Sequence, residues 1–396
     1  MTPLERRTVS SLALLYSFRM LGLFMVLPLL ALYAADLPGA DPLTIGLALG
    51  VYGLSQALLQ IPLGWLSDKL GRKPVIVGGL LVFALGSVVA GMAETIEGVV
   101  VGRALQGAGA IASTVMALVA DLTREEQRTK AMAIVGMSIG LSFAMALVLG
   151  PLVAAAGGLS AVFWFTTVLA IVGVAIVLLL VPTPPVGQMY DEVGARRGLF
   201  ARSLQDAGLL RLNFAVFSLH FVLMALFLVV PGLLLEVADL NRNSHWMVYL
   251  PALLLSIMGM VPMMIMAERK GRLHAMFLLA IVLLILAMTV ISAPASPLLL
   301  YLGMWLFFVG FNYLEATLPS LVSKMVFAGG KGTALGIYST CQFLGAFAGG
   351  ALGGWLLKSG GASLLLGCCL VLSALWLVVF LPTNSLLGAP AAARGE

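Results

Sequence analysis

Four ionisable side chains interrupt long apolar stretches of the sequence: Arg19, Arg103, His220 and Glu315. A charge at the centre of a bilayer costs roughly 2.5–3.5 kcal/mol on insertion scales, so residues of this kind are rare in apolar segments and indicate a functional site. Glu315 is the one carboxyl group near the middle of such a stretch. In a poorly solvated cavity it could exchange a proton near neutral pH, the range in which His220 also titrates.

Each of these residues has a structural as well as a chemical interpretation. We expect Glu315 to carry a proton or a cationic ligand, with His220 as its partner; alternatively, the two only hydrogen-bond within the C-terminal half. Arg19 could bind an anionic or polar ligand group or tune Glu315 electrostatically, or it could donate to backbone carbonyls at a helix break. Arg103 could be a hydrogen-bond donor between helices.

Amide side chains accompany the ionisable groups. Gln56 lies between Tyr52 and Gln60 at a spacing of four residues, so the three share one face of a helix. Such a face could line a binding site, although polar residues in membrane helices more often hold helices together. We include Gln56 and Asn312 among the candidate cavity residues. The other amides in apolar stretches are Gln106, Asn213 and Gln342.

The composition of the chain shows which elements must position these residues. The 396 residues are 61% hydrophobic and only 10% charged, whereas a soluble domain is about 25% charged. This excludes a soluble globular protein, and it also excludes a disordered chain, which would be polar and charge-rich. A membrane β-barrel would show segments of about ten residues in which apolar and polar side chains alternate. The apolar runs of this sequence are longer and do not alternate. We therefore predict an all-α integral membrane protein.

Twelve apolar stretches are long enough to cross a bilayer, for which about 20 residues are needed. The first is too long for the core of a signal peptide and is interpreted as uncleaved. The predicted spans are residues 9–34, 43–66, 75–93, 98–121, 131–156, 160–181, 209–235, 246–267, 275–293, 298–322, 333–357 and 362–381.

The basic residues set the orientation of these spans. If the N-terminus is cytoplasmic, all but four of the 22 Lys and Arg residues lie at the inner face; Arg242 and Lys358 lie outside, and Arg19 and Arg103 lie within spans. We therefore predict that both termini are cytoplasmic. The net charge of +5 is then explained by basic residues that set the topology and contact anionic lipid, and nucleic-acid binding is not needed to explain it. The three cysteines all lie in spans and form no disulfide or metal-ligand pattern.

The longest polar interruption divides the spans six and six. It runs from Pro182 to about Gly208, so we predict an N-terminal six-helix bundle at 1–181, a cytoplasmic linker at 182–208 and a C-terminal six-helix bundle at 209–396. Two such halves in one orientation form a parallel repeat, which is known in transporters. At an offset of 200 residues, Pro62, Asp68, Gly71 and Arg72 are echoed by Pro262, Glu268, Gly271 and Arg272.

Three motifs resemble those of the major facilitator superfamily. GWLSDKLGRKP at 64–74 is similar to its loop 2–3 signature, and RALQGAG at 103–109 is similar to its span 4 signature. Arg19, Gly22 and Pro28 in span 1 resemble the twelve-span drug/proton antiporter branch, most nearly its YajR-type members. The resemblance covers the whole chain.

The resemblance implies the fold of this superfamily, in which two pseudo-symmetric six-helix bundles rock about a central site, here driven by a proton gradient. In the family, spans 1, 4, 7 and 10 line the central cavity. These are the spans that carry Arg19, Arg103, His220 and Glu315. The resemblance also links Arg103 to proton coupling, with the interhelical donor as its alternative.

The resemblance further implies a conformational latch at the cytoplasmic end of the N-terminal bundle. In the family, loop 2–3 docks onto span 11 and stabilises the outward-open state. A carboxylate paired with arginine in a partly dry interface can hold one conformation and release it when protonated. The alternative is simple charge anchoring. The predicted latch consists of Gly64, Asp68, Gly71, Arg72, Asp121 and Arg128.

Small residues at a spacing of four predict close packing of membrane helices. We predict that spans 2 and 11 meet near their outer ends in the inward-open state, and that span 5 has a similar face; the alternative is packing within one bundle. The residues of this predicted interdomain packing are Gly46 and Gly50 in span 2, Gly150 and Pro151 in span 5, and Gly345, Gly349 and Gly353 in span 11.

These features favour a proton-coupled exporter of a small molecule in the cell inner membrane or plasma membrane. Gly150-Pro151 supports export because it resembles the motif that marks antiporters of the family, although Ala154-Ala155 replaces its final glycines. Arg19 favours the alternative, an uptake symporter or uniporter for a polar or anionic metabolite, because many exporters of this branch carry an acidic residue in span 1.

No enzyme is expected, because the sequence shows no nucleophile–base constellation, metal-ligand cluster or phosphate-binding loop. The predicted partners are the lipid bilayer, a small-molecule substrate and protons, without a cofactor or nucleic acid. The resemblance suggests a monomer.

Overall fold

The structure is a computed structural model that describes residues 1–182, 193–326 and 330–383. All regular elements in these ranges are helices, which confirms the all-α prediction. The chain divides into two compact units, Met1–Asp191 and Glu192–Glu396, called unit 1 and unit 2 below. Residues 183–192 of the predicted linker lie outside the described residues.

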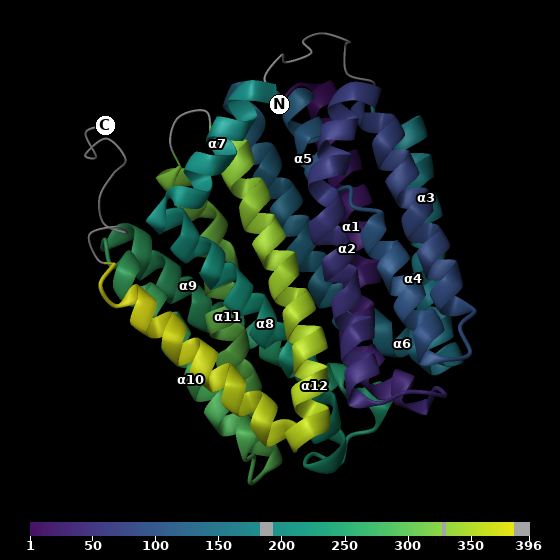
Figure 1. The fold of residues 1–396 in the computed structure, drawn as a ribbon, viewed down its shortest axis with the longest axis vertical. Coiled ribbons are helices and arrows are strands. Elements are labelled where there is room, and N and C mark those ends of the chain that lie inside the picture. Colours follow the sequence, from purple (N-terminus) through teal and green to yellow (C-terminus); the bar gives the residue numbers. More distant parts are fainter. Residues whose placement is uncertain (183–192, 327–329, 384–396) are drawn as a thin grey trace. The chain divides into compact units, whose positions relative to one another are not determined.

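The long helices of unit 1 run side by side (Figure 1). Helix α1 packs against α6, α3 packs against α4 and α6, and α2 packs against α4. The elements are α1 (Pro3–Tyr33), η1 (Ala34–Asp36), α2 (Pro42–Leu70), α3 (Arg72–Gly91), α4 (Ile96–Ala108), α5 (Ala112–Asp121) and α6 (Glu125–Leu179).

Capping boxes begin the first two helices. The Thr2 hydroxyl accepts a hydrogen bond from the backbone N–H of Glu5, and the Glu5 carboxylate accepts one from the backbone N–H of Thr2. Asp41 and Thr44 make the same reciprocal pair ahead of α2. A proline follows each cap at the start of the helix, where its missing N–H would have had no intrahelical partner.

The predicted fourth span, 98–121, is broken into α4 and α5 at Gly109. Gly109 lies against the backbone of α3, because a Cβ atom at this position would collide with the carbonyl oxygen of Gly79. The close approach of two helix backbones requires a residue without a side chain here. The break also frees the Gly109 carbonyl to accept hydrogen bonds from side chains.

Two helices contain a sharp bend at a glycine pair. Helix α6 bends at Gly157-Gly158, where Gly158 has a φ of +65°. Helix α12 bends at Gly360-Gly361, where Gly361 has a φ of +70°. Glycine populates this left-handed region without the steric cost that a Cβ atom brings. Both bends fall between two spans predicted from the sequence, 131–156 and 160–181 in the first case and 333–357 and 362–381 in the second.

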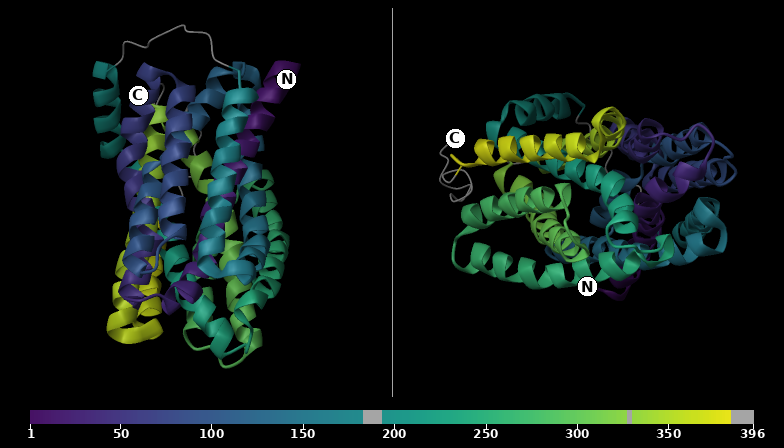
Figure 2. Two further views of the ribbon diagram at one scale, coloured as in Figure 1. Left: turned by 90° about the vertical axis from the view of Figure 1, so that its right-hand side faces the viewer. Right: turned by 90° about the horizontal axis from the view of Figure 1, so that it is seen from below.

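In unit 2, α8 packs against α12 and α11, and α11 also packs against α10 and α9 (Figure 2). Helix α7 lies within the predicted linker, where no helix was predicted. The elements are α7 (Val193–Gln205), α8 (Ala207–Glu236), η2 (Arg242–Ser244), α9 (Trp246–Arg269), α10 (Leu273–Ser292), α11 (Pro297–Met325) and α12 (Lys331–Phe380).

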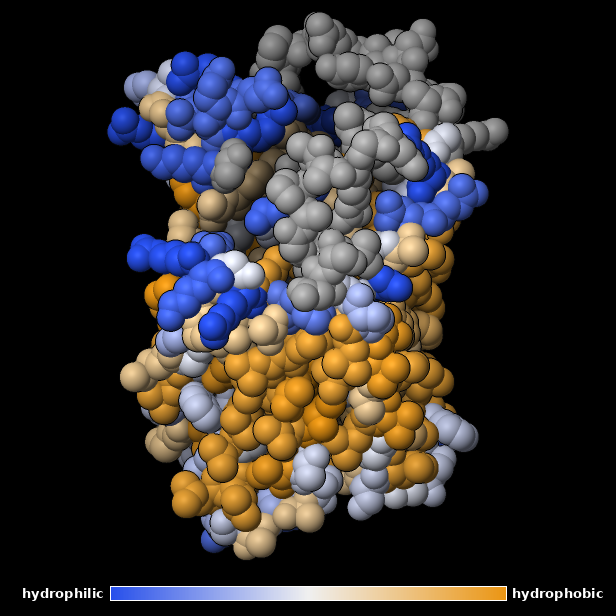
Figure 3. All heavy atoms as spheres, turned by 90° about the vertical axis from the view of Figure 1, so that its left-hand side faces the viewer, coloured by the Kyte–Doolittle hydropathy of each residue, from blue (hydrophilic) through white to orange (hydrophobic). Residues whose placement is uncertain are grey.

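Large hydrophobic side chains cover exposed helix faces. On α9, Leu254, Leu255, Met258 and Ile265 are all exposed. Figure 3 shows one face of the molecule on which hydrophobic side chains form a continuous field, with hydrophilic ones gathered toward one end. In the described ranges, 10 helical segments are long and apolar enough to cross a membrane. A contiguous apolar surface of this kind fits a lipid environment.

Candidate functional site

The predicted cavity residues divide between the two units. Arg19 and Arg103 lie on α1 and α4 of unit 1, whereas His220 and Glu315 lie on α8 and α11 of unit 2. Within each unit the structure brings the pair into one local network. That all four face a common cavity remains a prediction.

Arg19 joins three segments of unit 1. Its side chain is only 2% exposed, and Nη2 donates to the Tyr52 hydroxyl at 3.0 Å, to Gln56 Oε1 at 2.8 Å and to the carbonyl of Gly109 at 3.3 Å. Arg19 is therefore a donor at the helix break between α4 and α5, and it also contacts Gln56, which the sequence placed among the candidates.

Arg103 joins α4 to α2 and, through Gln106, to α3. The side chain is 1% exposed; Nε donates to the carbonyl of Ala48 at 3.2 Å and Nη1 to Gln106 Oε1 at 2.8 Å. Gln106 in turn donates to Ser87 Oγ at 2.8 Å. The Arg103 guanidinium carbon lies 4.9 Å from the centre of the Tyr52 ring, so both arginines contact the same tyrosine.

In unit 2, Gln342 lies between His220 and Glu315. Its Nε2 atom is 2.8 Å from His220 Nε2 and 3.4 Å from Glu315 Oε1, while the direct distance from His220 Nε2 to Glu315 Oε2 is 3.8 Å. His220 Nδ1 lies 3.1 Å from the carbonyl oxygen of Val216. A carbonyl only accepts, so this contact assigns the ring proton to Nδ1 and leaves Nε2 of the neutral ring as the acceptor for Gln342.

Gln342 is thus a site residue that the sequence analysis recorded as an amide but did not select. It lies on α12, which corresponds to predicted span 11 rather than to one of the four spans expected to line the cavity. Its signal in the sequence is an amide side chain inside an apolar stretch, which it shares with the selected residues Gln56 and Asn312.

Asn312, one of the predicted cavity residues, is hydrogen-bonded to α9. It lies one turn before Glu315 on α11, but its Nδ2 donates to Ser256 Oγ on α9 at 2.8 Å. Ser256 in turn donates to the carbonyl of Leu253. Asn312 therefore ties α11 to α9 and makes no hydrogen bond to the described side chains of His220 or Glu315.

Three of the predicted latch residues, Asp68, Arg72 and Asp121, lie together, while their role as a latch remains a prediction. Arg72 Nη1 lies 2.5 Å from Asp68 Oδ1 and 2.7 Å from Ser67 Oγ, and Arg72 Nε lies 3.0 Å from Asp121 Oδ2. One guanidinium therefore bridges carboxylates from the ends of α2 and α5. Gly71 makes the turn into α3 with a φ of +93°, which explains why glycine is needed there. Gly64 faces Ser113 of α5, where a Cβ atom would lie 3.4 Å from the hydroxyl oxygen of Ser113, so the structure does not require glycine at this position.

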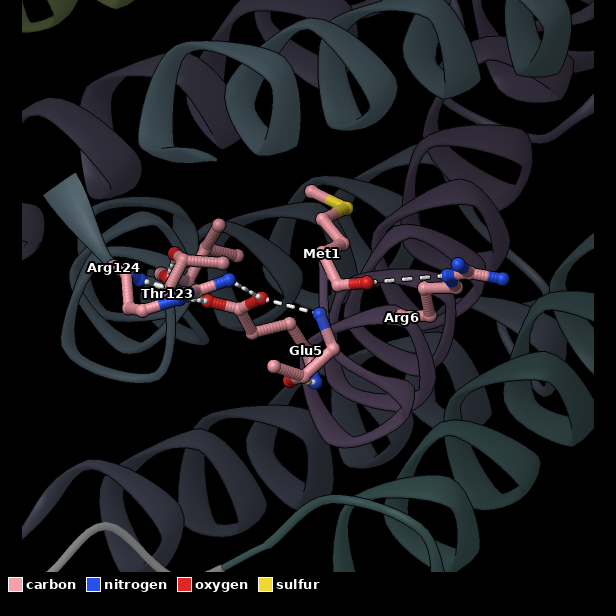
Figure 4. Close-up of polar contacts among 7 residues, drawn as sticks. Met1, Glu5, Arg6, Thr123 and Arg124 are labelled. Carbon is pink, nitrogen blue, oxygen red and sulfur yellow. Dashed lines mark hydrogen bonds and ion pairs between the residues drawn. The ribbon is translucent and has the colours of Figure 1, made fainter. Parts of the chain in front are cut away.

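Arg128 does not join this cluster; it is exposed and has no ion pair with a described side chain. The neighbouring ion pair is made by Arg124 instead. Arg124 Nε lies 2.9 Å from Glu5 Oε1, Arg124 Nη2 lies 3.3 Å from Glu5 Oε2, and the backbone N–H of Arg124 donates to Glu5 Oε1 at 3.2 Å (Figure 4). The start of α1 is therefore tied to the start of α6.

The Glu5 ion pair lies ahead of the apolar stretch that begins at residue 9. Hydrogen bonds from Arg124 and from the backbone of Thr2 lower the pKa of Glu5 to about 2, and the same contact raises the pKa of Arg124. The sequence contained one signal of this site, the Thr2 and Glu5 capping box. The partner of Glu5 could not be found because it is distant in the chain.

The small residues pack within their own units. A Cβ atom at Gly345 or Gly349 of α12 would collide with the carbonyl oxygen of Phe217 or Phe221 on α8, and Gly150 lies against α1. The alternative of packing within one bundle thus accounts for the spacing on α12. The predicted pairing between spans remains a prediction; its other members are Gly46 and Gly50, both buried on α2, Pro151 on α6, and Gly353 on α12.

Ten long apolar helical segments within the described residues, together with buried ionisable side chains, define a multi-pass membrane protein. Residues 12–350 match the Major Facilitator Superfamily, and the chain belongs to this family. It is therefore a membrane transporter and not an enzyme, as the sequence motifs indicated.

Individual relatives support this assignment. The chain is 48% identical over 382 residues to the inner membrane transport protein YajR of Escherichia coli (strain K12), a match that covers 96% of this chain and 84% of the relative. It is 26% identical over 352 residues to the multidrug resistance protein MdtH of Klebsiella pneumoniae (strain 342), covering 86% and 84%. The crystal structure of the nucleoside transporter NupG has the same fold, with a TM-score of 0.73 at 16% identity over 96% of this chain and 98% of that chain.

Proposed function

We propose that this protein is a proton-coupled exporter of a small molecule in the inner or plasma membrane, working as a monomer by alternating access. The carrying observation is the cluster of His220, Gln342 and Glu315: a carboxyl and an imidazole group 3.8 Å apart and bridged by an amide. Such a pair can hold one proton and pass it on when the site changes the side to which it opens. The similarity to MdtH and the Gly150-Pro151 motif support export.

The proposal includes twelve spans in two six-helix bundles, 1–181 and 209–396, joined by a cytoplasmic linker at 182–208. At 1.5 Å per residue, the 55 residues of α6 would measure about 80 Å if straight, whereas the hydrocarbon core is about 30 Å thick. The 50 residues of α12 pose the same problem. Two crossings by each of these helices, turning at the glycine pairs, resolve this problem and give an even number of spans, so that both termini lie on the same side. The distribution of Lys and Arg residues supports the cytoplasmic side.

The test is transport in proteoliposomes that contain the full chain, with a ligand first found by thermal stabilisation. An imposed pH gradient should drive movement of the ligand against the direction of proton flow. Glu315→Gln should abolish this gradient-driven transport, while the matched control Glu268→Gln, an exposed carboxyl of the same unit, should retain it. Gradient-driven transport by Glu315→Gln at the unmodified rate would contradict the proposal.

The second candidate is uptake of a polar or anionic metabolite, which Arg19 and Arg103 favour. The same experiment separates the two, because a symporter moves its ligand in the direction of proton flow. A uniporter would show no response to the pH gradient.

A further inference from the structure

Two arginines of unit 1 lie buried without a carboxylate partner. Arg19 and Arg103 are 2% and 1% exposed, and among the described side chains neither has a carboxylate within ion-pair distance. By contrast, Arg72 and Arg124 of the same unit form ion pairs at helix ends. The two guanidinium groups therefore place positive charge inside unit 1 with only neutral partners around them.

The donors that these residues leave unpaired point to the chemistry of a ligand. Around Tyr52, four buried nitrogen atoms have no hydrogen-bond partner in the described part of the chain: Nε and Nη1 of Arg19, Nη2 of Arg103 and Nε2 of Gln56. All four carry hydrogens and none can accept. Buried polar groups are almost always hydrogen-bonded. The ligand group that would satisfy these donors is therefore a hydrogen-bond acceptor that carries negative charge.

The remaining hydrogen bonds hold these donors in place. Arg19 is fixed through Nη2 by Tyr52, Gln56 and Gly109, and Arg103 is fixed through Nε and Nη1 by Ala48 and Gln106. The unpaired nitrogens are therefore on side chains that are already ordered. Ordering in advance lowers the entropy lost when a ligand binds.

We propose that Arg19, Gln56 and Arg103, gathered around Tyr52, bind an oxyanion of the transported substrate, such as a carboxylate or a phosphate. A cationic substrate is repelled by two guanidinium groups, and a neutral one leaves their charge uncompensated. The inference rests on the proposed function for access, because alternating access exposes a buried site to water from one side at a time.

The test is thermal stabilisation of the full chain in detergent by a panel of small carboxylates and phosphate esters. Each anion is compared with a neutral amide or alcohol of the same shape and with an ammonium analogue. We expect an anion to raise the Tm at concentrations at which its neutral and cationic counterparts do not. Because charged hydrogen bonds are lost, Arg19→Gln should weaken binding by about tenfold or more, whereas the exposed control Arg6→Gln should not change it.

A second variant tests the same site while both arginines stay in place. Gln56→Glu places a carboxylate beside Arg19 within the protein itself, so it should raise the Tm without ligand and abolish the response to anions. The inference is overturned if no anion of the panel outperforms its neutral counterpart, if a cation binds best, or if Gln56→Glu and Arg19→Gln respond to the anions as the unmodified chain does.

A third variant separates this inference from proton coupling. Glu315→Gln should keep the response of the Tm to the anion, because Glu315 belongs to the other unit. If Glu315→Gln also keeps gradient-driven transport while Arg19→Gln loses anion binding, the proton assignment is wrong and the anion site stands. If instead Glu315→Gln loses gradient-driven transport while Arg19→Gln keeps anion binding, the anion site is wrong and the proton assignment stands.

Discussion

At the residue scale, Gln342 is the side chain that connects His220 to Glu315. Its amide N–H groups can donate to neutral His220 and to the Glu315 carboxylate, but not to a His220 ring that carries a proton on Nε2. Gln342 therefore distinguishes the two protonation states of the pair. A proton that arrives at Nε2 displaces the amide and favours direct contact between the imidazolium and Glu315.

Replacing Gln342 with an apolar residue of similar length should change the pH dependence of transport. Gln342→Met removes the amide that links the two partners, so the pH profile of gradient-driven transport should differ from that of the unmodified chain. The matched control Asn312→Leu removes an amide that binds Ser256 instead and should leave the pH profile in place. An unchanged profile in Gln342→Met would show that the amide is only structural.

At the scale of elements, the Glu5 and Arg124 pair ties the start of α1 to the start of α6. The pKa of Glu5 is about 2, below its ordinary value of 4.5. A carboxyl with a lowered pKa contributes stability above the ordinary value, and this stability is lost as the pH falls toward the lowered value. The contribution should therefore be complete above about pH 4.5 and disappear toward pH 2.

Glu5→Gln tests this directly. At pH 7 the variant should melt at a lower Tm than the unmodified chain, and the difference should shrink as the pH is lowered from about 4.5 to 2. Glu94→Gln, an exposed carboxyl outside the helices of the same unit, serves as the control and should melt like the unmodified chain throughout. If the Tm of Glu5→Gln differs from that of the unmodified chain by the same amount at every pH, the charge of Glu5 is not the cause of the difference.

The contact between α8 and α12 depends on glycines that have no room for a side chain. Gly349→Ala should destabilise unit 2 by about 1–3 kcal/mol, because the added methyl group collides with the backbone carbonyl of Phe221 and overpacking costs energy of this order. Gly367→Ala is the matched control on the same helix, since open space surrounds that position. Denaturation in detergent measures both. Equal stability of the two variants would mean that α8 and α12 do not approach so closely.

The elements themselves were largely predictable, because the thickness of a bilayer sets the length of an apolar helix. The predicted span 246–267 corresponds to α9 at Trp246–Arg269, and 209–235 to α8 at Ala207–Glu236. The break at Gly109 was not predicted, because the span continues through it without a charged residue or a proline. It depends on the contact of Gly109 with Gly79 of another helix, which a pattern along one segment does not contain.

The ionisable residues of the candidate site were predictable, because a single charged side chain stands out in an apolar stretch of sequence. Arg19, Arg103, His220 and Glu315 were found in this way. The cluster of Asp68, Arg72 and Asp121 was expected from the resemblance of residues 64–74 to the loop motif of the family and from the predicted topology. Pairings between distant helices were not predictable from the sequence, as the contact of Glu5 with Arg124 and the bridging position of Gln342 show.

At the scale of the whole molecule, charge is distributed in a way that fits a transporter driven by an ion gradient. Unit 1 contains two buried guanidinium groups with unpaired donors, and unit 2 contains the carboxyl and imidazole pair. In the proposed cycle the first binds the anionic group of the substrate and the second carries the proton. Such a division of roles requires that substrate binding and proton movement be separable by mutation.

The most direct test is the movement of protons that accompanies the ligand. Proteoliposomes containing the full chain and a pH-sensitive dye should show a change of internal pH when the ligand is added outside without a preset pH gradient. Proton movement should depend on Glu315 and be absent in Glu315→Gln, although that variant still binds the ligand in the thermal assay. Ligand-induced proton movement of the same size in Glu315→Gln, or none in the unmodified chain while the ligand crosses the membrane, would contradict proton coupling at this site.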